Sequence, residues 1–166
     1  PPLLNLGDGP SGFTAYPGTG FGPRLAGKFL MCDFRGASGI SGIRTFGFRP
    51  RGASFEVADP DKLVWSLLAT DVEFGPDGAF YVSDWTEGWE LTGRGRIYRF
   101  FDPDFRKESA DVARLLGGDE LLRANETQLV ALLGHADRRI RQEAQFTLAE
   151  RGKSSAEALQ AVALNP

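Results

Sequence analysis

The feature that most constrains the fold of this chain is an abrupt change in composition close to residue 105. The segment up to Phe105 holds 17 of the 21 glycines, 9 of the 10 prolines and 18 of the 19 aromatic residues. Short runs rich in these residues are typical of strands joined by turns. The segment from Arg106 onward is rich in Ala, Leu, Glu and Arg, as helices are. The sequence therefore predicts a β-rich part and then a helical part, with the boundary near 102–107.

Eight segments of the first part have strand character and end at Gly, Pro, Asp or Ser. They are residues 12–16, 28–34, 43–48, 54–58, 63–68, 71–74, 79–85 and 96–101. The intervening residues 75–78 (GPDG) predict a hairpin turn, because Pro presets φ and Gly permits positive φ. Short strands at this spacing indicate a meander, and a propeller blade uses four strands in roughly 40 residues. We therefore expect residues 1–103 to be β-sheet blades of an incomplete β-propeller.

The second part predicts two capped helices joined by a short turn. Asn125, with Gln128 three positions later, has the spacing of a capping box, and Asp137 can cap the next helix. Apolar residues follow at helical spacing: Leu129, Leu132 and Leu133 in the first helix, then Ile140, Ala144 and Leu148 in the second. We expect residues 104–124 to be a linker with capping helices, and residues 125–166, which resemble HEAT repeats, to form an α-helical solenoid segment.

Charge and apolar patterning exclude several classes of protein. The net charge is −3 and no long basic run is present, so nucleic acid is not an expected partner. The longest uncharged apolar stretches span only a few residues, so no transmembrane segment is expected. The single Cys32 excludes an internal disulfide and a Cys-rich zinc site, and it is expected to be buried and inert. The chain opens at Pro1 without an initiator Met, and we expect it to be an internal fragment of a longer protein.

Aromatic and acidic residues near strand ends are the candidate ligand-binding groups. Trp85 and Trp89 could line a ligand mouth, since aromatic rings with a polar handle suit sugar-like or quinoid ligands; packing between sheets is the alternative. Asp71, Asp77 and Asp84 could supply oxygen ligands for calcium. The alternative is that Asp77 is a turn residue and the other two accept backbone hydrogen bonds. His135, the only histidine, is expected to have a structural role.

Three runs together resemble one protein family. They are residues 29–36 (FLMCDFRG), 70–78 (TDVEFGPDG) and 83–89 (SDWTEGW). With the run 129–144 (LVALLGHADRRIRQEA), which resembles a HEAT repeat, they make the chain similar to planctomycete-type membrane-bound dehydrogenases. The resemblance implies a six-bladed-type propeller, similar to that of glucose and sorbosone dehydrogenases, followed by HEAT repeats. Parent proteins of this family end in a Cys-x-x-Cys-His haem domain.

The resemblance also implies a set of ligands. Arg35 matches a basic residue that contacts pyrroloquinoline quinone, whereas an arginine pair of the family corresponds here to Leu68 and Thr70. The catalytic His and calcium ligands would precede Pro1. We therefore expect no cofactor in this fragment, which alone would be inactive. The parent would use pyrroloquinoline quinone, calcium and haem c.

The resemblance leaves two functions open. In the first, a periplasmic or secreted parent oxidises a sugar, polyol or other alcohol and passes electrons to haem c. In the second, the protein is a noncatalytic scaffold that binds glycans, or binds a protein partner through its HEAT repeats.

Overall fold

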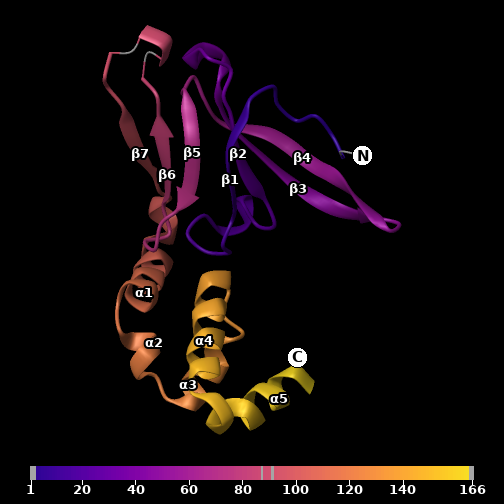
Figure 1. Ribbon diagram of the computed structural model, residues 1–166, viewed down its shortest axis with the longest axis vertical. Helices are drawn as coiled ribbons and strands as arrows, with labels where there is room; N and C mark the ends of the chain where they lie inside the picture. The colour runs from indigo at the N-terminus through magenta and orange to yellow at the C-terminus, as the bar shows by residue number, and fades with distance from the viewer. Residues whose placement is uncertain (1–2, 87, 91, 165–166) are drawn as a thin grey trace. The chain divides into compact units, whose positions relative to one another are not determined.

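The computed structural model describes residues 3–86, 88–90 and 92–164, which form two compact units (Figure 1). The β unit consists of residues 3–16, Phe21–Gly75 and Ala79–Asp102. The helical unit consists of residues 103–164 together with the short segments Pro17–Gly20 and Pro76–Gly78.

The β unit contains two antiparallel sheets. The four-stranded sheet has the order β1 (Pro10–Ala15), β2 (Phe29–Asp33), β3 (Gly42–Arg51), β4 (Ser54–Trp65). The three-stranded sheet has the order β5 (Ala69–Phe74), β6 (Phe80–Asp84), β7 (Arg96–Phe100). Three short 3-10 helices lie in the connections, at Gly22–Arg24, Ser38–Ile40 and Gly88–Glu90. Each sheet is a simple meander, because consecutive strands are neighbours.

One apolar core joins the two sheets. Leu30 and Cys32 of β2 and Val82 of β6 are completely buried in it, together with Val72 of β5. The sheets approach most closely where β1 meets β5: a Cβ added to Gly12 would lie 2.5 Å from the Cα of Asp71. Glycine at this position is therefore a packing requirement, because any side chain would force the two strands apart.

The structure corrects one strand boundary. Asp59 and Pro60 separate two expected strands, yet β4 runs without a break from Ser54 to Trp65. The register with β3 shifts beside them, and Asp59 has a φ of 49°, so the pair is accommodated as an irregularity within the strand. Proline is tolerated because β4 is at the edge of its sheet.

The expected hairpin at 75–78 is confirmed. Phe74 pairs with Phe80 across β5 and β6, and the Gly75 N–H donates to the Ala79 carbonyl at 2.8 Å. Gly78 has a φ of 72°, the left-handed conformation for which the turn needs a glycine.

Five α-helices make up most of the helical unit. They are α1 (Arg106–Gly117), α2 (Glu120–Arg123), α3 (Glu126–Leu132), α4 (Arg138–Glu150) and α5 (Ala156–Leu164), with 3-10 turns at Pro103–Phe105 and Gly152–Ser155. The expected capping box is confirmed, since Asn125 and Gln128 exchange hydrogen bonds of 2.9 and 2.8 Å. Asp137 caps α4 as expected, accepting the Arg139 N–H. Leu129 and Leu148 are fully buried between the helices.

The predicted fold class, an incomplete β-propeller followed by a HEAT-repeat solenoid, is wrong. The described residues form two small antiparallel sheets that close no barrel, and five helices. Five helices give at most two helical pairs among the described residues, fewer than the three repeats that a solenoid needs. Strand spacing and one capped helical hairpin are local signals, and neither specifies how further copies would stack. No helix among the described residues is both long and apolar enough to span a bilayer.

Candidate functional site

Three aromatic side chains gather where β2 and β6 end. Phe34 follows β2, and its ring stacks on that of Trp85, which follows β6, with a centroid distance of 5.9 Å and an interplanar angle of 24°. Trp89 meets Trp85 edge to face at 4.8 Å and 74°. Trp89 is nevertheless 70% exposed. The structure therefore brings the two predicted tryptophans together and presents one of them to solvent.

Two glycines allow Trp89 to lie where it does. Gly36 has a φ of 79°, and a Cβ added to it would lie 3.1 Å from the Trp89 indole nitrogen. Gly88 directly precedes Trp89 with a φ of 56° and is buried. Both backbone conformations favour glycine, so the loop sequence itself positions the exposed indole.

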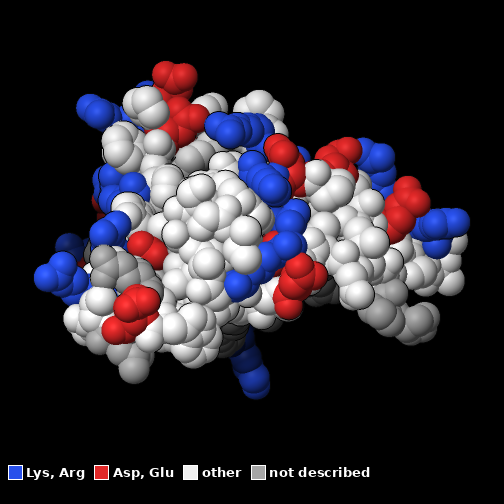
Figure 2. Space-filling model, turned by 90° about the horizontal axis from the view of Figure 1, so that it is seen from above, with Lys and Arg blue, Asp and Glu red and all other residues white. Residues whose placement is uncertain are grey.

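A hollow of about 680 Å³ adjoins this aromatic group. It is lined by Thr70, Ser83, Asp84, Trp85, Gly95, Arg96 and Ile97. The hydroxyls of Thr70 and Ser83 lie 2.8 Å apart. Trp85 contributes both to the hollow and to the contact with Trp89. The surface therefore combines exposed aromatic area with hydroxyl, carboxylate and guanidinium groups. Figure 2 views the molecule from above and shows Lys and Arg beside Asp and Glu around an uncharged area.

Arg35, the third predicted ligand-binding residue, is held by two carboxylates. Its guanidinium pairs with Asp33 at 3.1 Å and with Asp8 at 2.9 Å. The Asp33 side chain is completely buried and also accepts a 2.7 Å bond from Arg44. The backbone N–H groups of Asp8 and Gly9 donate to it as well, at 3.2 and 3.3 Å. Burial alone raises the pKa of Asp33, but the bonds from Arg35 and Arg44 outweigh it and lower that pKa to about 2.

This geometry does not fit recognition of a quinone by its carboxylates. The Arg35 guanidinium already has carboxylate partners. Leu68, at one position of the missing arginine pair, is 2% exposed. At the other position the Thr70 hydroxyl is bonded to Ser83. A Leu and a Thr offer no bidentate donor to a carboxylate.

The three aspartates proposed as calcium ligands are not assembled into one group. Asp84 accepts the Leu68 N–H at 3.1 Å, and Asp71 accepts the N–H of the next residue, Val72, at 2.9 Å. Asp77 lies in the turn between β5 and β6, whereas Asp84 lies at the opposite end of β6. Within the described ranges no three His, Cys, Asp or Glu side chains are grouped to hold a metal ion.

Cys32 and His135 have surroundings that suit structural roles. Cys32 is fully buried, and burial raises the pKa of its thiol to about 12. It is therefore protonated at neutral pH and is a poor nucleophile. The His135 Nδ1 accepts the backbone N–H of Asp137 at 2.9 Å, which fixes the turn before α4.

Sequence reasoning missed two parts of this arrangement. One is the network that joins Asp33 to Arg35 and Arg44; the other is the hydroxyl pair of Thr70 and Ser83. A signal existed for the first, because Asp33 is the one charged residue in the run 29–34 and Arg35 follows two positions later. Residues two apart on a strand share a face, which favours such a pair.

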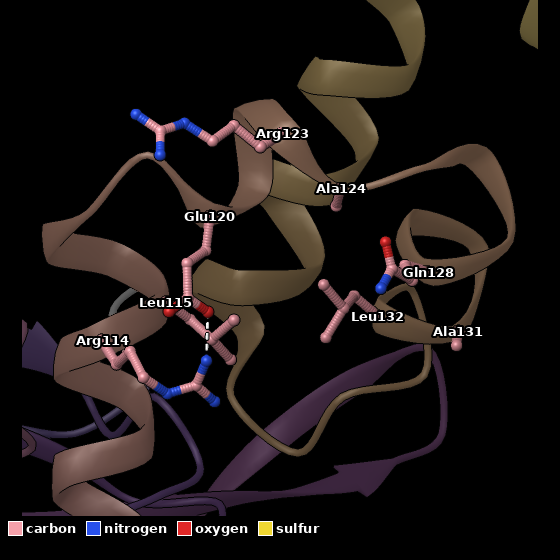
Figure 3. A pocket seen from close by; sticks show the side chains of 8 residues that line it. All are labelled: Arg114, Leu115, Glu120, Arg123, Ala124, Gln128, Ala131 and Leu132. Atoms are coloured by element: carbon pink, nitrogen blue, oxygen red, sulfur yellow. Dashed lines mark hydrogen bonds and ion pairs between the residues drawn. The ribbon is translucent and has the colours of Figure 1, made fainter.

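A second hollow lies within the helical unit, bordered by α1, α2 and α3 (Figure 3). Its volume is about 550 Å³. Leu115 and Leu132 provide apolar walls, while Arg114 and Glu120 form an ion pair at its edge. The charges at this edge neutralise each other, so the hollow offers less to a polar ligand than the tryptophan surface does.

The chain was compared with models of known protein families, with curated proteins and with solved structures, and none of the three gave a match.

Proposed function

We propose that the β unit binds a sugar or polyol at the surface formed by Trp85, Trp89 and the adjoining hollow, and that it does so without catalysis. The observation that carries this proposal is the 70% exposed Trp89 ring, which is braced by Trp85. An exposed indole has an apolar ring face and a polar N–H, and holding it in one orientation suits it to stack on a ligand. We name this set of residues, with Thr70 and Ser83, the tryptophan surface.

The chemistry of the tryptophan surface suits a neutral polyhydroxy ligand. The apolar C–H face of a sugar can pack on an indole ring, while its hydroxyls need donors and acceptors at the edge. Thr70 and Ser83 supply hydroxyls that both donate and accept, and Asp84 lines the same hollow. A few polar groups beside an aromatic wall are the usual composition of a small-molecule site.

The sequence resemblance points to the same class of ligand. Thr70 begins one of the runs similar to sugar-oxidising dehydrogenases, and Ser83, Asp84, Trp85 and Trp89 belong to another. On this proposal the surface holds the sugar or polyol, and any oxidation of it would need groups other than those described. A periplasmic or secreted location, as in that family, belongs to the same proposal.

Isothermal titration calorimetry of the protein with a panel of mono- and oligosaccharides and polyols tests the proposal. We expect saturable binding of at least one sugar with a dissociation constant near ~1 mM or tighter, the range open to a shallow site. Trp89→Ala should weaken sugar binding at least tenfold, and Trp89→Phe should retain part of the binding affinity. Trp65→Phe is the matched control, since Trp65 lies beside Arg44 and Lys62 and does not contribute to the tryptophan surface.

Two results would overturn this assignment. One is the absence of saturable binding for every sugar and polyol at ~10 mM, since that concentration exceeds the expected dissociation constant tenfold. The other is unchanged binding by Trp89→Ala. A parallel titration with pyrroloquinoline quinone and calcium tests the oxidoreductase alternative: micromolar binding that Arg35→Ala abolishes would favour it over glycan binding.

A further inference from the structure

The outer face of the four-stranded sheet carries a continuous row of phenylalanine rings, here named the phenylalanine face. It consists of Phe13, Phe29, Phe46, Phe48 and Phe55, one or two from each strand. Neighbouring ring centroids are 5.2 to 6.3 Å apart along the row. These distances are those of aromatic pairs in protein cores.

The strand register explains how the row arises. Phe29 of β2 pairs with Phe46 of β3, so both rings lie on the same side of the sheet. Leu30 and Cys32 point to the opposite side and are fully buried in the core of the β unit. Apart from Asp33 at its end, β2 is therefore apolar on both faces, a pattern typical of strands that are covered on both sides.

The phenylalanine face is nevertheless open. Phe13 is 54% exposed, Phe48 40% and Phe55 55%. At about 200 Å² for a whole aromatic side chain, these three alone expose about 300 Å². Leu3 and Leu4, which line a pocket with Phe46 and Phe48, are half-exposed beside them. The patch thus falls in the size range of the largest apolar patch on a typical monomer, which often has a function.

Charge is distributed unequally over the two sides of the outer part of the hairpin formed by β3 and β4, whereas nearer its base Arg44 lies on the same side as Phe46 and pairs with Asp33. Phe48 and Phe55 lie on the apolar side. Arg49 and Glu56 each follow one of these phenylalanines in the sequence and are paired with each other across the two strands, so they lie on the other side. Ion pairs occupy that other side, including Arg49 with Asp59 at 2.8 Å. None of the residues that make up the phenylalanine face is charged. A partner for it must therefore be apolar too.

We infer that the phenylalanine face is the interface of a homodimer, in which two copies of the sheet pack face to face about a twofold axis. A second copy supplies an equally uncharged aromatic surface, so association buries no unpaired charge. A standard interface buries about 800 Å² per partner, of which about 65% is apolar in homodimers, or about 520 Å². The exposed phenylalanines and leucines supply an apolar area of the order of that ~520 Å². Facing sheets would then lie about 10 Å apart.

Sedimentation velocity over a range of concentrations tests the inference on the whole chain. We expect dimers at ~100 μM that dissociate on dilution, the behaviour of a micromolar complex. The double variant Phe48→Glu with Phe55→Glu should weaken dimerisation about 100-fold or more, because exposed aromatic anchors dominate such interfaces. Arg51→Ala is the matched control, since Arg51 is an exposed residue of the same hairpin on its charged side. It should dimerise as the unaltered chain does.

Three results would overturn the inference of a homodimer through the phenylalanine face. A monomer at every concentration up to ~100 μM overturns the inference, as does a dimer that survives both glutamates. Equal weakening by Arg51→Ala would place the contact elsewhere on the hairpin and overturn it too. If circular dichroism shows that the double variant is unfolded, Phe13→Glu on β1 replaces it, since that residue belongs to the same face on a different strand.

Discussion

Replacing Asp33 by Asn tests how strongly the buried charge network holds the β unit together. The substitution keeps the size of the side chain and removes the one charge that both Arg35 and Arg44 contact. The amide would still occupy a completely buried position but would no longer attract two guanidinium groups. We expect a clear loss of stability at neutral pH.

The magnitude follows from the pKa and from exposure. Lowering the pKa of Asp33 from 3.8 to about 2 corresponds to about 2.4 kcal/mol of unfolding free energy at neutral pH. Arg35 is 29% exposed, so solvent screening reduces this contribution to about 1 to 2 kcal/mol. The guanidiniums left without their partner add a further penalty, but both reach water, so the total should be about 2 to 3 kcal/mol.

The effect must depend on pH in one direction. A carboxyl group whose pKa is lower in the folded state stabilises the fold above its unfolded pKa, near 3.8. That stabilisation is lost as the pH falls through the folded pKa, about 2. The difference in unfolding free energy between the unaltered chain and Asp33→Asn should therefore be constant from pH 7 to about 5. It should shrink by about half by pH 3.

Urea unfolding followed by tryptophan fluorescence measures the difference. Trp65, Trp85 and Trp89 all belong to the β unit, so the signal reports on that unit alone. Asp59→Asn is the control, because Asp59 pairs with an arginine while 63% exposed and should cost at most about 1 kcal/mol. Equal losses in the two variants, or a difference for Asp33→Asn that grows toward acid, would refute the reasoning.

Two further predictions concern other buried groups. Cys32, with its pKa raised to about 12 by burial, should not react with a thiol reagent within minutes at pH 8 in the folded protein, but should react fully in urea; rapid labelling of the folded state would contradict this. Burial raises the pKa of Asp137, but bonds from Arg139 and Thr19 lower it overall. Asp137→Asn should therefore cost the helical unit about 2 kcal/mol, measured by circular dichroism at 222 nm, against a small effect for the exposed Asp119→Asn.

Local signals in the sequence predicted local structure well. The turn at 75–78 and the caps at Asn125 and Asp137 are each specified by residues within four positions of one another. The hydrogen bonds that define them join residues close together in the sequence, so local patterns are sufficient to predict them.

Long-range arrangement could not be predicted in the same way. The sequence indicates strands but not how many sheets they form, and the expected propeller and solenoid required stacking that no local motif encodes. The uninterrupted β4 shows the same limit, because Asp59 and Pro60 normally end a strand and are accommodated here by a shift in register. Pairing with β3 outweighs the local preference of these two residues.

The candidate site was foreseen in part. The positions of Trp85 and Trp89 after a strand suggested a shared ligand surface, and the structure places the two rings in contact. Arg35 was expected to meet a ligand, yet Asp33 and Asp8 hold its guanidinium. Asp8 is 25 residues away from Asp33, and no pattern in the sequence predicts that the two lie beside the same arginine.

The tryptophan surface and the phenylalanine face can be tested separately because they share no residue. Trp89 contacts Trp85, which follows β6, whereas Phe48 and Phe55 lie on the hairpin of β3 and β4. Trp89→Ala should weaken sugar binding at least tenfold and leave the dimer intact, and the double glutamate variant should weaken the dimer and leave sugar binding intact. If one variant removed both sugar binding and dimerisation, the sugar would have to bind across the two copies of a dimer. The sugar titration would then depend on protein concentration, which calorimetry at two concentrations would reveal.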